Sequence, residues 1–303
     1  MRKRSWLGVA AAAAAAAVPC ASAQAPPVFP SSVESVYVDV FVSRGGQPIA
    51  GLQAASFELK DNGVRQAVEL AAAESMPLRA VLVFDTSSSV MGERLAALKA
   101  AGEAFLNGLR PADEVALVGF SEEIAWLAPA TADKAAVRRA LDRLEPAGAT
   151  AAYDALYAAI ALSEAAGRAL IVLFTDGEDN MSVLGANQLL TVVERSNALV
   201  HTVGWRSPEA TESAPRSITD AQISELDQAL ALRQIAEATG GRSWAADSPE
   251  RLRRAFAEIA EAMSHRYVLR YEPQGVKPEG WHRIEVKLRG QKGEVQARHG
   301  YLR

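Results

Sequence analysis

The stretch AVLVFDTSSSV, residues 80–90, joins five apolar residues to one carboxylate and four hydroxyls. A continuous apolar run of this length, without polar alternation, is typical of a strand that is buried on both faces of a parallel sheet. The polar residues then follow at the carboxyl end of that strand. Because ligands of open parallel sheets bind beyond the carboxyl ends of the strands, residues 85–89 are a candidate binding site.

The middle of the chain repeats this pattern of apolar strand and helix. Apolar runs at 115–120, 169–175 and 199–205 are separated by segments of helical character. Such alternation predicts an α/β fold over residues 78–264, with a doubly wound, mostly parallel sheet flanked by helices. The polar stretch 206–222 within this domain is predicted to be an exposed loop.

The two ends of the chain have a different character, rich in β-branched and aromatic residues. VYVDVFV at 36–42 is typical of a strand, and Asn62-Gly63 lies between two strand-like runs, which is a strong hairpin signal. Three further strand-like runs follow after the helical part of the chain. We expect the segments 24–77 and 265–303 to pair into one small antiparallel β unit, because a hairpin alone is marginal in water.

Residues 1–23 have the pattern of a secretory signal peptide. A basic start, MRKR, precedes an alanine-rich apolar run that is too short to span a bilayer, and Ala21-Ser22-Ala23 provides small residues for a signal peptidase. We expect cleavage after Ala23 and a secreted or periplasmic mature chain, without a transmembrane segment. Because Cys20 is the only cysteine and lies before this point, the mature chain would form neither a disulfide nor a thiolate metal site.

Three polar clusters fall where strands of the predicted sheet end or helices begin. The first holds Asp85, Ser87 and Ser89, the second is Thr150 in a Gly-Ala-Thr loop, and the third is Asp176 in a Thr-Asp-Gly sequence. Each cluster alone could be a helix cap or a turn. Together, carboxylate and hydroxyl oxygens form a hard donor set, which favours Mg²⁺, Mn²⁺ or Ca²⁺ over zinc.

These residues resemble the signature of the von Willebrand factor A-type domain, which is Asp-x-Ser-x-Ser, then a distant Thr, then a distant Asp-Gly. Here DTSSS begins at Asp85, Thr150 lies in GATAAYDAL, and Asp176 lies in FTDGEDN. The resemblance covers roughly residues 78–264. The flanking β segments look like those of secreted bacterial proteins called VWFA-related, a group best known from acidobacteria. In one departure from the pattern, Ser88 stands where the family frequently has Gly.

The resemblance implies a metal-ion-dependent adhesion site, or MIDAS, that binds one Mg²⁺, with Mn²⁺ or Ca²⁺ as alternatives. Ser87 and Ser89 would bind the metal directly, and Thr150 would do so directly or through water. Asp85 and Asp176 would hold waters or the metal itself and supply negative charge. An acidic residue of a protein partner would complete the coordination. An extended turn after Asp85 would point alternate side chains at one metal.

The predicted function is an extracytoplasmic, metal-dependent protein-binding or adhesion module, and not an enzyme. The net charge of −4, without a basic stripe, argues against a nucleic-acid partner. Two alternatives are a metal-assisted or serine hydrolase, with Ser87 or Ser89 as nucleophile, and a structural component of an envelope assembly. The chain has no Gly-x-Ser-x-Gly motif, and no histidine lies near an apparent partner acid in the sequence, which disfavours the hydrolase.

Overall fold

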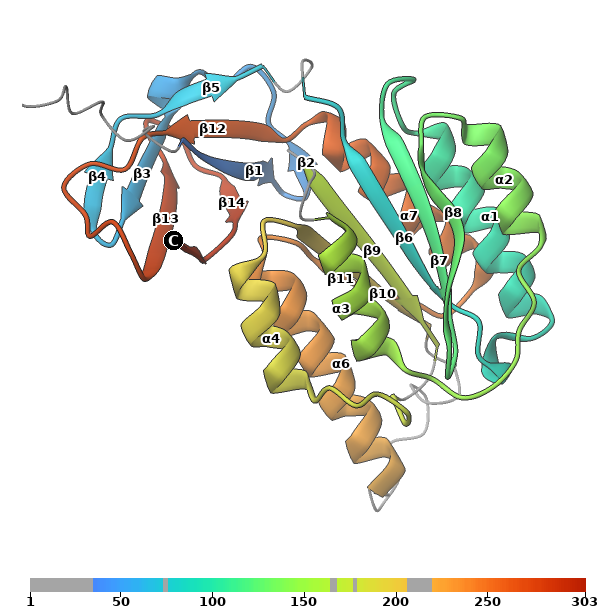
Figure 1. The fold of residues 1–303 in the computed structure, drawn as a ribbon. Helices are drawn as coiled ribbons and strands as arrows, with labels where there is room; N and C mark the ends of the chain where they lie inside the picture. The colour runs from blue at the N-terminus through green and yellow to red at the C-terminus, as the bar shows by residue number, and fades with distance from the viewer. Residues whose placement is uncertain (1–34, 73–75, 164–167, 177–178, 206–219) are drawn as a thin grey trace, which may run out of the picture. The chain divides into compact units, whose positions relative to one another are not determined.

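Six strands form one sheet in the order β11-β10-β9-β6-β7-β8 (Figure 1). The computed structural model describes residues 35–72, 76–163, 168–176, 179–205 and 220–303. All neighbouring strands in this sheet are parallel, except that β8 at one edge is antiparallel to β7. The predicted doubly wound, mostly parallel α/β sheet is therefore confirmed. Its strands are β6 (Arg79–Asp85), β7 (Glu114–Phe120), β8 (Ile124–Thr131), β9 (Ala169–Thr175), β10 (Leu199–Trp205) and β11 (Ser243–Ala246).

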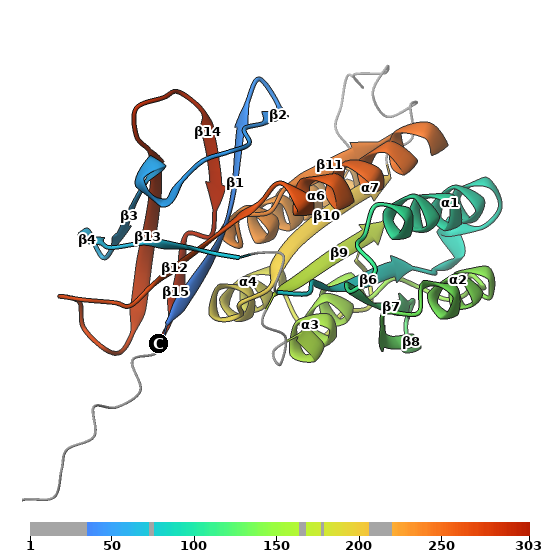
Figure 2. The ribbon, with the colours of Figure 1, turned by 90° about the horizontal axis from the view of Figure 1, so that it is seen from above.

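Helices cover both faces of this sheet, as Figure 2 shows from above. Successive strand residues point to opposite faces, so Leu82 and Phe84 pack into one helical layer while Val81 and Val83 pack into the other. The first layer contains α1 (Glu93–Asn107), α2 (Lys134–Asp142) and α7 (Pro249–Ser264). The second layer contains α3 (Ala152–Ser163), α4 (Ala186–Arg195) and α6 (Asp220–Ala238).

The segments from the two ends of the chain form two further small sheets, as the β unit of the sequence analysis predicts. One has the order β14-β1-β12-β5, with β2 paired to β1, and the other has the order β15-β13-β3-β4. Val38 pairs with Leu269 and Leu59 pairs with Val286, so strands about 230 residues apart in the chain lie side by side. Their strands are β1 (Val36–Arg44), β2 (Gln47–Pro48), β3 (Phe57–Asp61), β4 (Val64–Gln66), β5 (Glu69–Ala71), β12 (Tyr267–Tyr271), β13 (Trp281–Leu288), β14 (Glu294–Ala297) and β15 (Gly300–Leu302).

The predicted hairpin connects β3 and β4. Asn62 has a φ of 46° and Gly63 has a φ of 81°, the left-handed values that a tight hairpin turn demands. The prediction of three strand-like runs near the end of the chain was incomplete. The last of them, VQARHGYLR, divides into β14 and β15, which belong to different sheets.

Two expectations fall wholly or mostly outside the described residues. The signal peptide, residues 1–23, is one of them. The predicted loop at 206–222 is the other, although its last three residues, 220–222, belong to helix α6, so the prediction was wrong there. Among the described helices, none is long and apolar enough to cross a membrane.

Candidate metal centre at the carboxyl edge of the sheet

Four of the five predicted site residues lie at or just after the ends of β6 and β9. Asp85 is the last residue of β6, and Asp176 directly follows β9. These two strands are parallel neighbours, with Phe84 paired to Phe174. The sheet therefore brings two carboxylates that are 91 positions apart in the sequence to the same edge.

Three of the predicted side chains touch one another. The Ser87 and Ser89 hydroxyl oxygens lie 2.8 Å apart, and the Ser89 hydroxyl donates to Asp176 Oδ1 at 2.6 Å. The expected extended turn after Asp85 was wrong in detail. Ser87 is extended, with a φ of −67° and a ψ of 167°, but residues 88–90 form a 3₁₀ turn, which folds Ser89 back beside Ser87.

Asp85 lies behind these hydroxyls and holds the loop in shape. Its carboxylate is fully buried; Oδ1 accepts from the Ser87 backbone N–H at 2.8 Å, and Oδ2 accepts from the Thr175 hydroxyl at 2.7 Å. Burial raises the pKa of the Asp85 carboxyl, the hydrogen bonds from Ser87 and Thr175 lower it in part, and the charge of Asp176 raises it further. A cation nearby would relieve this unfavourable burial of charge.

Thr150 joins the site through its backbone. Its N–H donates to Asn180 Oδ1 at 3.0 Å, and its carbonyl accepts from the backbone N–H groups of Asn180 and Met181. In the same loop, the Gly148 carbonyl accepts from the Ser88 backbone N–H at 3.0 Å. The loops that carry the three polar clusters are therefore tied to one another by hydrogen bonds, and Thr150 itself is buried.

Gly148 is required for this arrangement of the loops. Its φ is +80°, which disfavours any residue with a Cβ, and a Cβ at this position would lie 2.9 Å from the Glu122 side chain. Glu122 in turn accepts from the Ala149 backbone N–H at 3.3 Å. The Glu122 side chain thus contacts the chain just before Thr150.

Arg94 is a member of the site that the sequence analysis missed. Its guanidinium Nη1 lies 2.6 Å from Asp176 Oδ2 and 3.3 Å from the Ser89 carbonyl, and the group lies 6.0 Å from the centre of the Trp205 ring. The sequence held one indication of this role. A cation in the first turn of a helix is unfavourable beside the positive end of the helix dipole unless an acid compensates for it. Arg94 is the second residue of α1, and Asp176 is that acid.

Asp179, although close in sequence, serves helix α3 instead. Its carboxylate accepts from the Tyr153 backbone N–H at 2.9 Å and from the Ser182 hydroxyl at 2.7 Å. It thereby satisfies donors at the amino end of α3, where a negative charge is favourable. Asp179 thus bonds the start of helix α3, which follows Thr150, to the segment after Asp176.

The donor set fits a hard divalent cation. Among the described residues, no three His, Cys, Asp or Glu side chains are grouped so that they could hold a metal ion, so a site here depends on hydroxyl oxygens as well as carboxylates. Ser89 Oγ touches both Ser87 Oγ and Asp176 Oδ1, which brings three oxygens from two loops together. Such an all-oxygen set suits Mg²⁺, Mn²⁺ or Ca²⁺.

Comparisons with known proteins agree with the fold. A family model described as the von Willebrand factor type A domain matches residues 80–178. The chain is 27% identical over 208 residues to a UPF0353 protein of Mycolicibacterium paratuberculosis, covering 62% of this chain and 61% of that protein. It is 24% identical over 228 residues to a UPF0353 protein of Mycobacterium sp. (strain KMS), covering 67% and 64%. The matches thus span less than two thirds of the length of these relatives.

A solved structure described as von Willebrand factor type A from Catenulispora acidiphila has the same fold. It aligns with a TM-score of 0.51 at 16% identity, over 89% of this chain and 75% of that chain. The part matched by the family model includes β6 from Ala80 onward, the Thr150 loop and Asp176. The chain therefore carries a von Willebrand factor type A domain, and all five predicted site residues lie within it.

Proposed function

We propose that this protein is a metal-dependent protein-binding module. Asp85, Ser87, Ser89, Thr150 and Asp176 would hold one divalent cation, Mg²⁺ in the first place, and an acidic residue of a protein partner would complete its coordination. The observation that carries the proposal is the pair of contacts made by Ser89, which joins Ser87 to Asp176 across two loops. Hydroxyls and a carboxylate brought together in this way form the kind of oxygen cluster that a hard cation binds.

The residues of the site would have distinct tasks. Asp85 holds the Ser87 backbone in place through its Oδ1, and Thr175 fixes the other oxygen of the same carboxylate. Ser87, Ser89 and Asp176 present oxygens toward one another at the edge of the sheet. A bound divalent cation would supply the positive charge that attracts a partner carboxylate, because the hydroxyl ligands donate no charge of their own.

The surroundings of the site favour a protein as the partner. Ser88 and Ser89 are exposed, so a ligand can approach from solvent. Met91, Met181 and Val183 belong to the same group of loops and are 61%, 52% and 91% exposed. Exposed apolar side chains beside a polar site are typical of protein interaction surfaces, and methionine adapts readily to different partners.

The two buried histidines lend no support to a serine hydrolase. His201 is buried in β10, where its Nδ1 accepts from the Arg242 backbone N–H at 2.9 Å. His282 is buried in the β unit, where it contacts Asp61. Neither has a hydrogen bond with Ser87 or Ser89 among the contacts of the described residues, so the general base that an activated serine needs is not paired with either.

We also place this function outside the cytoplasm, in the periplasm or the medium. The support is the sequence pattern of residues 1–23, a basic start followed by an apolar run and small residues at a cleavage position. Intact-mass measurement of the exported protein tests this part directly. A mature chain that begins at Gln24 is expected, and a lipid adduct on Cys20 would contradict it.

Partner capture with and without metal tests the binding function. Immobilised wild-type protein is exposed to envelope extract in Mg²⁺ and, in parallel, in EDTA, together with Asp176→Ala. The control is Asp133→Ala, an acid at the exposed start of α2, far from the site in the fold. We expect a partner that wild type and Asp133→Ala retain in Mg²⁺ and release in EDTA, and that Asp176→Ala does not retain. Retention that is equal in EDTA would refute metal-dependent binding.

A further inference from the structure

A cavity lies at the opposite, amino edge of the six-stranded sheet. Its volume is about 450 Å³, and it is lined by parts of the β unit together with the start of β10 and the residue before β9. Strands of seven residues, at about 3.3 Å a residue, place it roughly 20 Å from the Ser87–Ser89–Asp176 cluster. It is therefore separate from the proposed metal centre, and a ligand in this cavity would not need a metal at the other edge.

The charges that line this cavity are unbalanced. Among the described residues that line it, the cations are Arg168, Arg195, Arg298 and Arg303, while Asp39 is the one acidic side chain. This imbalance occurs in a chain whose net charge is −4. An excess of guanidinium groups around a concave space focuses positive potential into that space.

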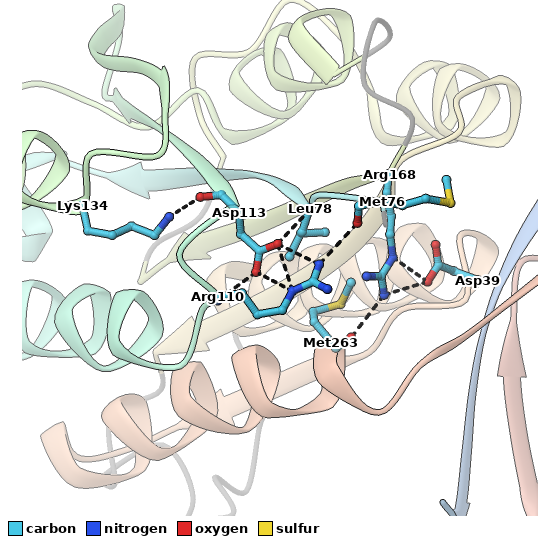
Figure 3. A network of polar contacts seen from close by, with 8 residues as sticks. All are labelled: Asp39, Met76, Leu78, Arg110, Asp113, Lys134, Arg168 and Met263. Carbon is cyan, nitrogen blue, oxygen red and sulfur yellow. Dashed lines mark hydrogen bonds and ion pairs between the residues drawn. The ribbon is translucent and has the colours of Figure 1, made fainter. Parts of the chain in front are cut away.

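Asp39 cannot compensate for these cations, because its carboxylate is already shared. Arg168 approaches Asp39 Oδ1 at 3.3 Å, as Figure 3 shows, and also donates to the Met263 carbonyl at 3.1 Å. Arg266, which is not among the residues that line the cavity, approaches the same oxygen at 3.5 Å. Both arginine side chains are at most 3% exposed, so two buried cations depend on one carboxylate.

Arg298 is a cation held by neutral oxygens. Its Nε donates to the Gly300 carbonyl at 2.6 Å, and its two terminal nitrogens donate at 2.8 Å to Asn197 Oδ1 and to the Ser196 carbonyl. It forms no ion pair with any described acid. Burial lowers the pKa of Arg298 to about 10. These bonds hold the guanidinium rigidly in the wall of the cavity.

Arg195 adds an available cation at the rim. It ends helix α4, it is exposed, and within the described part of the chain it forms no ion pair. Asn197, two residues later, lines the cavity as well and is already bonded to Arg298. Arg195 and Arg298 both line this cavity, and each guanidinium has the planar fork of N–H groups that matches a carboxylate or phosphate.

We propose that this cavity is a binding site for a small organic anion, whose carboxylate or phosphate group is held by Arg195 and Arg298. Its volume is in the range of small-molecule sites. The walls also include Val36, Leu199 and Val268, so the ligand carries an apolar part next to its anionic group. Arg168 acts at longer range, because its charge is already paired with Asp39, whereas the acceptors of Arg298 are neutral.

Calorimetry with phenyl phosphate and benzoate as probes tests this site, with the full mature chain in EDTA so that metal plays no part. Two further probes separate the contributions: benzyl alcohol lacks the charge, and inorganic phosphate lacks the apolar part. Both anionic probes are expected to bind at least about tenfold more tightly than benzyl alcohol, because charge-assisted hydrogen bonds to arginine are lost with the alcohol. Phenyl phosphate is also expected to bind more tightly than inorganic phosphate, and equal binding of these two would refute the apolar contact.

Variants locate the site. Arg195→Gln removes the exposed cation and should weaken phenyl phosphate binding about fivefold, and Arg298→Lys, which keeps the charge but loses the planar fork, should weaken it as well. Arg139→Gln on the exposed face of α2, whose Asp133 partner is also exposed, is the matched control and should bind like wild type. The amide signals of Val36 and Leu199 should shift on binding. Unchanged affinity in both Arg195→Gln and Arg298→Lys, or shifts confined to other residues, would overturn the assignment.

Discussion

Arg94 and Asp176 form an ion pair of 2.6 Å, and the other oxygen of the same carboxylate accepts from Ser89 at 2.6 Å. The Asp176 side chain is fully enclosed, whereas that of Arg94 is 32% exposed. The protein thus carries its own cation at the point where the proposed divalent cation would bind. This arrangement stabilises the Asp176 carboxylate without metal, and it sets Arg94 in competition with metal for the same charge.

Replacing Arg94 with Gln should therefore strengthen the binding of Mg²⁺. Removing a partly exposed positive charge next to a ligand carboxylate is worth about 1 kcal/mol, or roughly fivefold in the dissociation constant. Calorimetric titration with Mg²⁺ measures the effect, with Arg139→Gln as the control for the loss of an exposed arginine. Weaker binding of Mg²⁺ to Arg94→Gln would show that Arg94 supports the metal site and does not compete with it.

The stability of the protein should decrease in mild acid because of His201. Burial, with the nearby charge of Arg266, lowers the pKa of His201 from 6.5 to about 3. The unfolded chain therefore takes up a proton below about pH 6.5, while the folded protein does not, so the free energy of unfolding falls as the pH falls from about 6.5 toward 3. Between pH 6.5 and pH 5, this one group accounts for up to about 2 kcal/mol.

Urea unfolding at pH 7.5 and pH 5.0 tests this prediction. His201→Asn keeps an acceptor near the position of Nδ1, which bonds to the Arg242 backbone N–H, but cannot be protonated. Its loss of stability between the two pH values should be smaller than that of wild type. The exposed His299, replaced in the same way, serves as control and should leave the wild-type difference in place. Equal acid sensitivity of wild type and His201→Asn would contradict the role of His201.

Asp61 should be among the most sensitive positions of the β unit. Its fully buried carboxylate lies 2.8 Å from His282 Nδ1 and accepts from the hydroxyls of Tyr271 at 2.9 Å and Tyr301 at 3.1 Å. Asp61→Ala leaves these buried groups without their partner and should cost about 3 kcal/mol or more of unfolding free energy.

A surface ion pair provides the control for Asp61. Asp247→Ala removes the partner of Arg251, whose side chain is 67% exposed, and should cost under about 1 kcal/mol. Both variants are compared with wild type by chemical unfolding. Similar small losses for the two variants would mean that the buried network around Asp61 contributes little to stability.

The pairing of the terminal segments leads to a prediction on truncation. Removing residues 267–303 takes away β12, β13 and β14, to which β1 and β3 are hydrogen-bonded. Residues 36–74 should then lose their structure, because an isolated hairpin is marginal in water, while residues 78–264 should stay folded. Amide hydrogen exchange reports on each part, and slow exchange that persists in 36–74 would contradict this prediction.

The sheet could be predicted from the sequence because its signals are local. Apolar runs such as 80–84 and 169–175 need no partner to indicate a buried strand, and their order fixes a parallel arrangement. The positions of Asp85 and Asp176 followed from the ends of those strands. The contact of Asp176 with Arg94 did not, because it depends on how helix α1 is oriented over the edge of the sheet.

The buried polar network of the β unit could have been anticipated in part. Asp61 continues the inward-facing series of Phe57 and Leu59, and His282 precedes Ile284 on the buried face of β13. Polar residues at such positions indicate a satisfied polar pair in the core. Which residues pair could not be predicted, because the register that places β13 against β3 joins residues 221 positions apart.

The most direct test of the proposed metal centre is a calorimetric titration of Mg²⁺ into wild type, Asp85→Ala and Ser87→Ala, with Asp133→Ala as control. Wild type and Asp133→Ala should bind one Mg²⁺. Asp85→Ala should lose this binding yet stay folded, because the substitution takes away a buried negative charge near Asp176. Ser87→Ala should bind more weakly than wild type but more tightly than Asp85→Ala, since water can replace a neutral hydroxyl. Binding of Mg²⁺ to Asp85→Ala with wild-type affinity would contradict the assignment of the site.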